Sequence, residues 1–495
     1  MWFSVLPKIS TRNTKKCYLI VEGRYVILVG GDFKYEEDIA VKKENDLGRD
    51  PIGKLVLRLA IPTMIAQFVN ILYSIIDRMY IGNIPKIGDL ALAGVGICGP
   101  IVTLLSSFGT LVGLGGSILM AMRLGEGNEK RAKQLMSNSF LMLVSFAAVL
   151  TISFLLLKDK LLMWFGASPI TFEYANTYMT IYTAGTFFAL MSIGLNYFIT
   201  CQGFATIGMA TVLTGAVTNI VLDPIFIFGF DMGVAGAAVA TVIAQMASCI
   251  FAMVFLFGKK VPIGICFGNY EWKIILKILA VGFSPFLILS TDSVIILVTN
   301  AVLQKYGGAG QGDLLISGAT IVQSFMMLIT GPLIGISGGT QAILSYNYGA
   351  KQIDRVKKAE WHILKMALIF TTAMFLLTQI AAPYFVMIFT RQGNLTQLAI
   401  WGIKVFALGA IPLSFQYVLV DGLTALGRTK TALGLSLFRK CGYVVLTMVF
   451  PAIMTAKAAF YAEPVIDVVS ATLSVIVYML VIGKHLRQRE QAVIK

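Results

Sequence analysis

Two apolar stretches of the chain decide its fold: PTMIAQFVNILYSIID at residues 62–77 and PFLILSTDSVIILVTN at residues 285–300. Each begins with a proline and reaches a polar residue after the same spacing, but Asp77 of the first stretch corresponds to Asn300 in the second. Further matches follow in the same order along both halves: Gly109 and Gly113 match Gly331 and Gly335, Arg131 and Lys133 match Arg355 and Lys357, and Gln202–Gly203 matches Asp421–Gly422. This series indicates that residues from about 54 to 495 consist of two copies of one module, an internal repeat of the kind found in many membrane transporters.

The composition indicates a membrane protein. Hydrophobic residues make up 57% of the 495 residues and charged residues only 13%, whereas a soluble domain carries about 25% charged residues. Repeated apolar stretches of about 20 residues have the length of a helix that crosses the hydrocarbon core, and they lack the alternation of a membrane β-barrel. We therefore predict an all-α polytopic membrane protein with twelve transmembrane helices in two pseudo-symmetric six-helix lobes. The spans are expected at about residues 55–81, 90–121, 135–157, 174–199, 206–229, 233–257, 275–303, 314–346, 361–388, 397–421, 431–454 and 458–483.

The distribution of basic residues predicts the orientation in the membrane. The net charge is +15, and most Lys and Arg residues outside the spans fall in one set of alternate loops, among them Arg131, Lys259 and Lys357. The positive-inside rule places these loops and both termini in the cytoplasm, in a multi-pass protein of the cell inner (plasma) membrane. Because topology accounts for the basic charge, we expect the lipid bilayer as partner and no nucleic acid. We also expect a monomer.

The repeat also sets the domain boundaries. Residues 1–53 lie outside it and contain only one short apolar run, so we expect a cytoplasmic extension there. Lysines, a proline and glycines interrupt the apolar pattern at residues 258–274. We therefore expect a six-helix N-terminal lobe at residues 54–260 and a six-helix C-terminal lobe with a cytoplasmic tail at residues 261–495. Six spans return the chain to the same side of the membrane, so the copies have parallel topology.

Two carboxylates within the predicted spans are the strongest functional signals. Asp77 lies late in the first span and Asp223 late in the fifth, and an ionised aspartate costs about 2.5–3.5 kcal/mol at the membrane centre. Asn219 precedes Asp223 by four residues and therefore shares its helical face, while Pro224 frees a backbone carbonyl beside it. These residue types suit a site for a proton or small cation. The alternative for Asp77 is that it faces the membrane interface beside Arg78.

The second copy lacks both of these acids. Asn300 stands in place of Asp77, and Gly442 stands in place of Asp223. We therefore expect only the first copy to keep carboxylates inside the bilayer, and the cation site to belong to the N-terminal lobe.

Other charged residues allow more than one interpretation. Asp292 in the seventh span is either a second functional carboxylate or a local hydrogen-bonding group. Asp421 and Glu463 lie near predicted span ends, where we expect interfacial solvation. Arg439 and Lys440 fall inside the eleventh span, where they either line an aqueous cavity or bind lipid headgroups.

Several functions are disfavoured by motifs that the sequence lacks. It contains no G-x-x-x-x-G-K-[ST] nucleotide-binding loop and no H-E-x-x-H zinc motif. The six cysteines are scattered, so neither a metal site nor a disulfide framework is indicated. We therefore expect no ATP-driven transport, no enzyme activity, and neither cofactor nor metal.

Four segments resemble the multidrug and toxic compound extrusion (MATE) family, in particular its bacterial members that carry a proton site. They are LAIPTMIAQFVNILYSIIDRMYIG at residues 59–82, NIVLDP at 219–224, GVAGAAVATVIAQ at 233–245 and NYGAKQIDRVKK at 347–358. The resemblance extends from about residue 48 to 485. It implies two six-helix lobes around a central cavity, and export of small hydrophobic, mostly cationic drugs in exchange for protons or sodium.

Residue by residue, the resemblance implies a cation-coupling site formed by Asp77, Asn219, Asp223 and Thr241. It also implies a helix kink at Pro62 that contributes to gating. Pro224, which directly follows Asp223, is a second candidate for such a kink. Some sodium-coupled relatives use carboxylates in the seventh and tenth spans, where Asp292 and Asp421 are possible secondary carboxylates. Both H⁺ and Na⁺ therefore remain candidate coupling ions, with Na⁺ also possible at the Asp77 site.

We expect a secondary active antiporter that works by alternating access. The alternative is a lipid-linked precursor flippase of related two-lobe architecture, which would favour a strongly cationic cavity and additional spans. A passive channel or a membrane enzyme is a third possibility. Transport that needs no gradient would indicate the channel, and the missing catalytic motifs disfavour the enzyme.

Overall fold

The computed structural model describes residues 17–21, 24–29, 32–34, 45–390 and 393–491, and it divides into two compact units, Met1–Glu44 and Asn45–Lys495. In the first unit, strands β1 (Cys17–Val21), β2 (Arg24–Val29) and β3 (Asp32–Lys34) pair antiparallel in the order β1-β2-β3. The rest of the expected N-terminal extension up to residue 44 lies outside the described residues, as do residues 492–495 of the expected tail.

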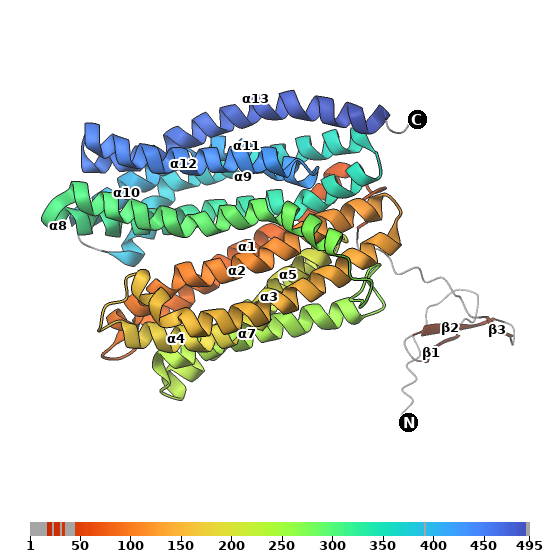
Figure 1. Ribbon diagram of the computed structural model, residues 1–495, viewed down its shortest axis with the longest axis horizontal. Coiled ribbons are helices and arrows are strands. Elements are labelled where there is room, and N and C mark those ends of the chain that lie inside the picture. The colour runs from red at the N-terminus through yellow and green to blue at the C-terminus, as the bar shows by residue number, and fades with distance from the viewer. Residues whose placement is uncertain (1–16, 22–23, 30–31, 35–44, 391–392, 492–495) are drawn as a thin grey trace. The chain divides into compact units, whose positions relative to one another are not determined.

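The second unit consists of helices that run side by side (Figure 1). Its helices are α1 (Ile52–Gly82), α2 (Gly88–Gly125), α3 (Glu129–Trp164), α4 (Phe172–Ala184), α5 (Thr186–Thr200), α6 (Ala205–Pro224), η1 (Ile225–Gly229, a π-helix), α7 (Gly233–Phe257), α8 (Trp272–Gly349), α9 (Ile353–Phe389), α10 (Gly393–Ala407), α11 (Ala410–Ala425), α12 (Thr429–Ile453), η2 (Ala456–Tyr461, a 3₁₀-helix) and α13 (Ala462–Gln491).

Within the described residues these helices supply the twelve predicted spans. Ten segments are long and apolar enough to cross a membrane, and two bent pairs, α4 with α5 at 57° and α10 with α11 at 48°, complete the number. Helix α8 holds two spans, Trp272–Gly308 and Leu314–Gly349, and Gly308 between them has a positive φ of 64°. Ile278 and Leu344 belong to one core cluster, although a straight helix would separate them by about 100 Å. The chain therefore reverses within α8.

Among the described residues, the two halves share a buried hydrophobic cluster at one end of the bundle only. Where α1 begins, Leu55 of the first half and Ile343 of the second half belong to the same buried cluster. Where α1 ends, the first half has its own cluster around Ile81, and the second half has a separate one around Leu303. The fold is thus two six-span lobes that are joined at the end where α1 begins, which confirms the predicted fold class.

Glycines allow the lobes to approach closely at the joined end. A Cβ at Gly125, the last residue of α2, would overlap the carbonyl oxygen of Tyr346 in α8. In the same way a Cβ at Gly349 would overlap the carbonyl oxygen of Met122. These two glycines occupy matching positions in the repeat. Small residues that let helix backbones meet are typical of packing in lipid.

The segment Asn45–Asp50, which precedes α1, ties the lobes together at this end. Asn45 Nδ2 donates to the carbonyl oxygen of Gly203 in the first lobe at 2.8 Å. In the second lobe, Arg355 Nη2 donates to the carbonyl oxygens of Leu47 at 3.1 Å and of Asp50 at 2.9 Å. The segment therefore bridges the two lobes, through the Asn45 side chain on one side and its own backbone carbonyls on the other.

We expect Arg355→Ala to loosen this bridge. The change removes both charge-assisted hydrogen bonds from Arg355 to this segment, each of which contributes about 1.5–3 kcal/mol. Amide hydrogen exchange of residues 45–52, measured by mass spectrometry, should therefore accelerate by about tenfold or more. The matched control is Lys357→Ala, because Lys357 is an exposed cation of the same helix. Equal exchange rates in the two variants would contradict the prediction.

Candidate functional site

Helices α6 and α7 place three of the predicted site residues in one buried cluster. Asn219 and Asp223 lie one turn apart on α6, and Asn219 Nδ2 donates to Asp223 Oδ1 at 3.1 Å. The same amide nitrogen lies 3.4 Å from Oγ1 of Thr241 on α7. Thr241 donates its hydroxyl to the carbonyl oxygen of Ala237 at 3.0 Å, so its oxygen is oriented to accept from Asn219. Asp223 has no exposed surface.

Asp77 joins this cluster from α1. Its carboxyl group lies within hydrogen-bonding reach of the carboxyl group of Asp223. Among the described residues, neither Asp77 Oδ1 nor Asp223 Oδ2 receives a hydrogen bond. Two carboxylates that share a buried site repel each other unless a proton or a cation lies between them. Asp77 thus faces Asp223, whereas Arg78 next to it is exposed.

Three tyrosines that the sequence reasoning missed line the same site. Tyr73 of α1 and Tyr178 of α4 lie close to Asp77, and the Tyr178 hydroxyl is within hydrogen-bonding reach of Thr241. Tyr182 stacks on Tyr178 with ring centroids 6.1 Å apart. The i, i+4 spacing of Tyr178 and Tyr182 was visible in the sequence, but nothing in it showed that this face of α4 turns toward α7.

The two predicted kink prolines differ in their local structure. Helix α1 continues through Pro62, and the hydroxyl of Thr63 donates to the carbonyl oxygen of Leu59 at 2.8 Å and to that of Gly335 at 2.7 Å. Pro224 is the last residue of α6, and the chain passes from it into the π-helix η1. The backbone is therefore irregular directly beside Asp223, which suits a site that changes its geometry.

The sequence and the fold together identify the family. The family model MatE matches residues 62–225 and 293–453, which is most of both lobes. The chain belongs to the MATE family. It is 23% identical over 404 residues to the multidrug export protein MepA of Staphylococcus aureus strain MSSA476, which covers 81% of this chain and 87% of MepA.

Solved MATE structures share the fold. A MATE transporter in the straight conformation superposes with a TM-score of 0.84 at 24% identity, over 90% of this chain and 99% of that one. The outward-facing conformation of a multidrug resistance MATE family transporter of the MOP superfamily gives a TM-score of 0.83 at 23% identity, over 89% and 98% of the two chains. This MATE chain therefore has the two-lobe fold of those proteins.

The second lobe of this MATE protein does not repeat the site. At Gly442, the position that matches Asp223, a Cβ would overlap the side chain of Ile466 from α13. An apolar contact therefore fills the place where the first lobe holds a carboxylate.

The second lobe nevertheless holds buried acids of its own at other positions. Glu360 of α9 is 6% exposed and Asp467 of α13 is 0% exposed. Comparison of the two copies covered only the positions that match Asp77 and Asp223, so it did not detect acids on other helices.

Asp421 and Glu463, for which interfacial solvation is expected, are partly buried in the fold and also have polar partners. Ser337 Oγ donates to Asp421 Oδ2 at 2.6 Å, and Arg439 Nη2 contacts Glu463 Oε1 at 2.5 Å. Both acids therefore have partners within the lobe. Each lies close to a helix end in the sequence, and in the fold a neighbouring helix supplies its partner.

Asp292 and Asp421 lie in separate clusters. Asp292 forms an ion pair with Lys440 of α12, while Asp421 contacts Ser337 of α8. Lys440 and the adjacent Arg439 are thus engaged with acids of their own lobe, an arrangement that neither interpretation of them anticipated. Asp292 is half exposed, so it is the member of this cluster that a solute can reach.

Proposed function

We propose that this MATE protein is a secondary active multidrug antiporter, which exports small hydrophobic, mostly cationic compounds in exchange for protons or sodium by alternating access. The observation that carries the proposal is the facing pair of buried carboxyl groups, Asp77 on α1 and Asp223 on α6. A pair of this kind binds a cation tightly while α1 and α6 keep it buried. Once the pair is exposed to water, the binding weakens. Its occupancy can therefore bias the conformation of the first lobe.

The coupling follows from differential binding. If the ion binds one conformation more tightly than the other, and the drug does the opposite, each changes the affinity of the other by the same factor. The separate cores of the lobes at the end where α1 ends support a state in which this end opens first. Asn219 and Thr241 hold the Asp223 side chain in place, whereas Pro224 allows the end of α6 to move.

The remaining expectations belong to the same proposal. We place the protein in the plasma membrane as a monomer with both termini in the cytoplasm, and we assign it no enzyme activity and no cofactor besides the coupling ion. The relative MepA is a multidrug export protein, which supports the drug substrates. The twelve spans found among the described residues disfavour a lipid-linked precursor flippase, which would favour additional spans.

We expect drug export to require an ion gradient. Purified protein in proteoliposomes should move a fluorescent lipophilic cation about tenfold faster under an imposed pH gradient or an imposed sodium gradient than without one, a ratio in the range of measured coupling. The two gradients are imposed separately, so the experiment also identifies the ion. Transport at the same rate without any gradient would contradict the proposal and indicate a channel.

A further inference from the structure

A second carboxyl pair lies in the C-terminal lobe, on helices that do not carry the first; Glu360 is buried and Asp421 is partly buried. Glu360 of α9 lies directly against Gly422 of α11, where a Cβ would overlap its carboxylate oxygens. Asp421, the neighbour of Gly422, is close enough to Glu360 for their charges to interact. The two acids therefore meet across the contact between α9 and α11.

Nothing among the described residues neutralises Glu360. None of the ion pairs in the described part of the chain involves Glu360 or Asp421. The hydroxyl of Tyr478 is the neighbouring donor, but no hydrogen bond of ordinary geometry from a described residue reaches either Glu360 oxygen. A buried carboxylate without a partner costs several kcal/mol, whereas the neutral acid does not. The site therefore favours a bound proton.

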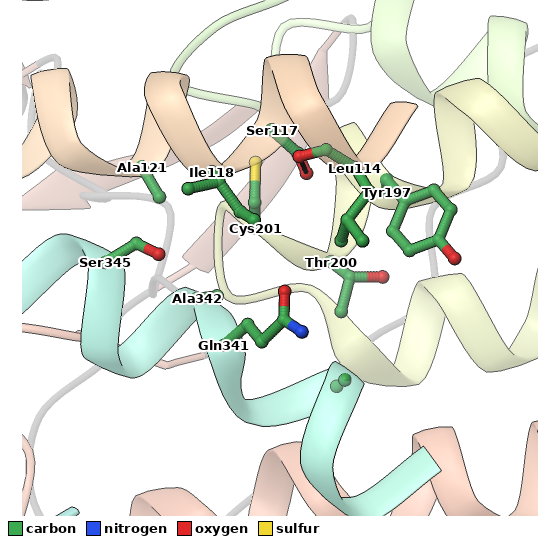
Figure 2. A pocket seen from close by; sticks show the side chains of 12 residues that line it. Leu114, Ser117, Ile118, Ala121, Tyr197, Thr200, Cys201, Gln341, Ala342 and Ser345 are labelled. Carbon is green, nitrogen blue, oxygen red and sulfur yellow. Dashed lines mark hydrogen bonds between the residues drawn. The ribbon is translucent and has the colours of Figure 1, made fainter. Parts of the chain in front are cut away.

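A small cavity between the lobes is connected to this pair through Gln341, although neither acid lines it. The amide of Gln341 on α8 is within hydrogen-bonding reach of Asp421, while its Oε1 has no hydrogen-bond partner among the described residues. Figure 2 shows the Gln341 side chain pointing into the space beside Thr200 and Cys201 of the other lobe. The cavity has a volume of about 20 Å³, which is enough for a water molecule.

The pair is not the repeat copy of the first site. The positions of the first lobe that match Glu360 and Asp421 are Met136 and Gln202, neither of which is an acid. Each lobe has thus acquired its own carboxyl pair at a different place: α1 with α6 in the first lobe, and α9 with α11 in the second.

We propose that Glu360 and Asp421 form a second proton-binding site, connected through Gln341 to the cavity between the lobes. In the binding step a hydronium ion gives its proton to a carboxylate oxygen, which leaves one neutral carboxylic acid and one water molecule. In transport, the site would add one proton to each cycle. This role in transport rests on the proposed antiport. The proton binding itself does not depend on it.

The test is infrared difference spectroscopy of the full-length protein in lipid nanodiscs during a pH titration, which detects the C=O stretch of a protonated carboxyl group. All measurements use the Asp77→Asn, Asp223→Asn background. The first site then contributes no carboxyl signal, so an error in its assignment cannot be mistaken for an error in that of the second. We expect Glu360→Gln to remove one carboxyl band. The exposed Glu129 of α3 supplies the control, Glu129→Gln, which should leave that band unchanged.

A second variant keeps the test decisive if Glu360→Gln does not fold. Asp421→Asn removes the neighbouring negative charge that favours protonation of Glu360, so proton binding should weaken by about tenfold. A titration that is identical in Asp421→Asn and its parent would overturn the proposal. So would a folded Glu360→Gln protein that retains every protonated carboxyl band.

Discussion

Replacing Asp223 with asparagine is expected to abolish ion-driven drug export and to leave the fold intact. The asparagine oxygen can still accept the hydrogen bond that Asn219 Nδ2 donates to Asp223 Oδ1 at 3.1 Å. What is lost is the charge that, together with Asp77, binds the coupling ion in the proposed mechanism. In proteoliposomes, the gradient-driven rate should fall by at least about tenfold, toward the rate measured without a gradient. Asp77→Asn should have the same effect, because either change leaves a single carboxylate.

A matched control separates the site from a general effect of aspartate removal. Asp159 lies at the end of α3, and its side chain is 67% exposed. Asp159→Asn removes the same charge from the same lobe and should leave gradient-driven export unchanged. If Asp223→Asn exports as fast as Asp159→Asn, the coupling site lies elsewhere in the protein. If Asp223→Asn instead loses its thermal unfolding transition, Asp77→Asn at the half-buried end of the pair decides the question.

The spans and the core of the first site could be predicted because both depend on local sequence. Hydrophobic length determines a span, and a spacing of four residues puts Asn219 and Asp223 on one helical face. The repeat then showed that these residues have no counterparts in the second half. The place of Thr241 came from the resemblance to relatives, and the structure puts its hydroxyl oxygen 3.4 Å from Asn219.

The partners of charged residues in the second lobe could not be predicted in the same way. Arg439 on α12 meets Asp467 on α13 across a separation of 28 residues, and such a meeting depends on which helix faces pack together. Glu360 was overlooked for a related reason, because it lies near the start of α9, in a sequence rich in charged residues that otherwise face solvent. Periodicity identifies an apolar face, but it does not show which polar residue a neighbouring helix covers.

Replacing Arg439 with methionine is expected to give the largest loss of stability. Arg439 Nε contacts Asp467 Oδ1 at 2.7 Å, and Nη2 contacts Glu463 Oε1 at 2.5 Å. Asp467 has no exposed surface, so the substitution leaves a buried carboxylate without its cation. Breaking a buried ion pair in this way costs about 3–5 kcal/mol. Thermal and denaturant unfolding of the purified protein in detergent measures the change.

An exposed arginine of the first lobe provides the comparison. Arg131 forms an ion pair with Glu271, and the two side chains are 51% and 46% exposed. Because water and salt screen such a pair, Arg131→Met should change the stability only slightly. The combined variant Arg439→Met, Asp467→Leu should recover much of the loss, since it removes the buried charge together with its partner. Failure of the second change to restore stability would mean that Arg439 acts through its packing rather than through its charge. In that case Arg439→Lys, which keeps the charge and loses the guanidinium group that contacts both acids, should be as unstable as Arg439→Met.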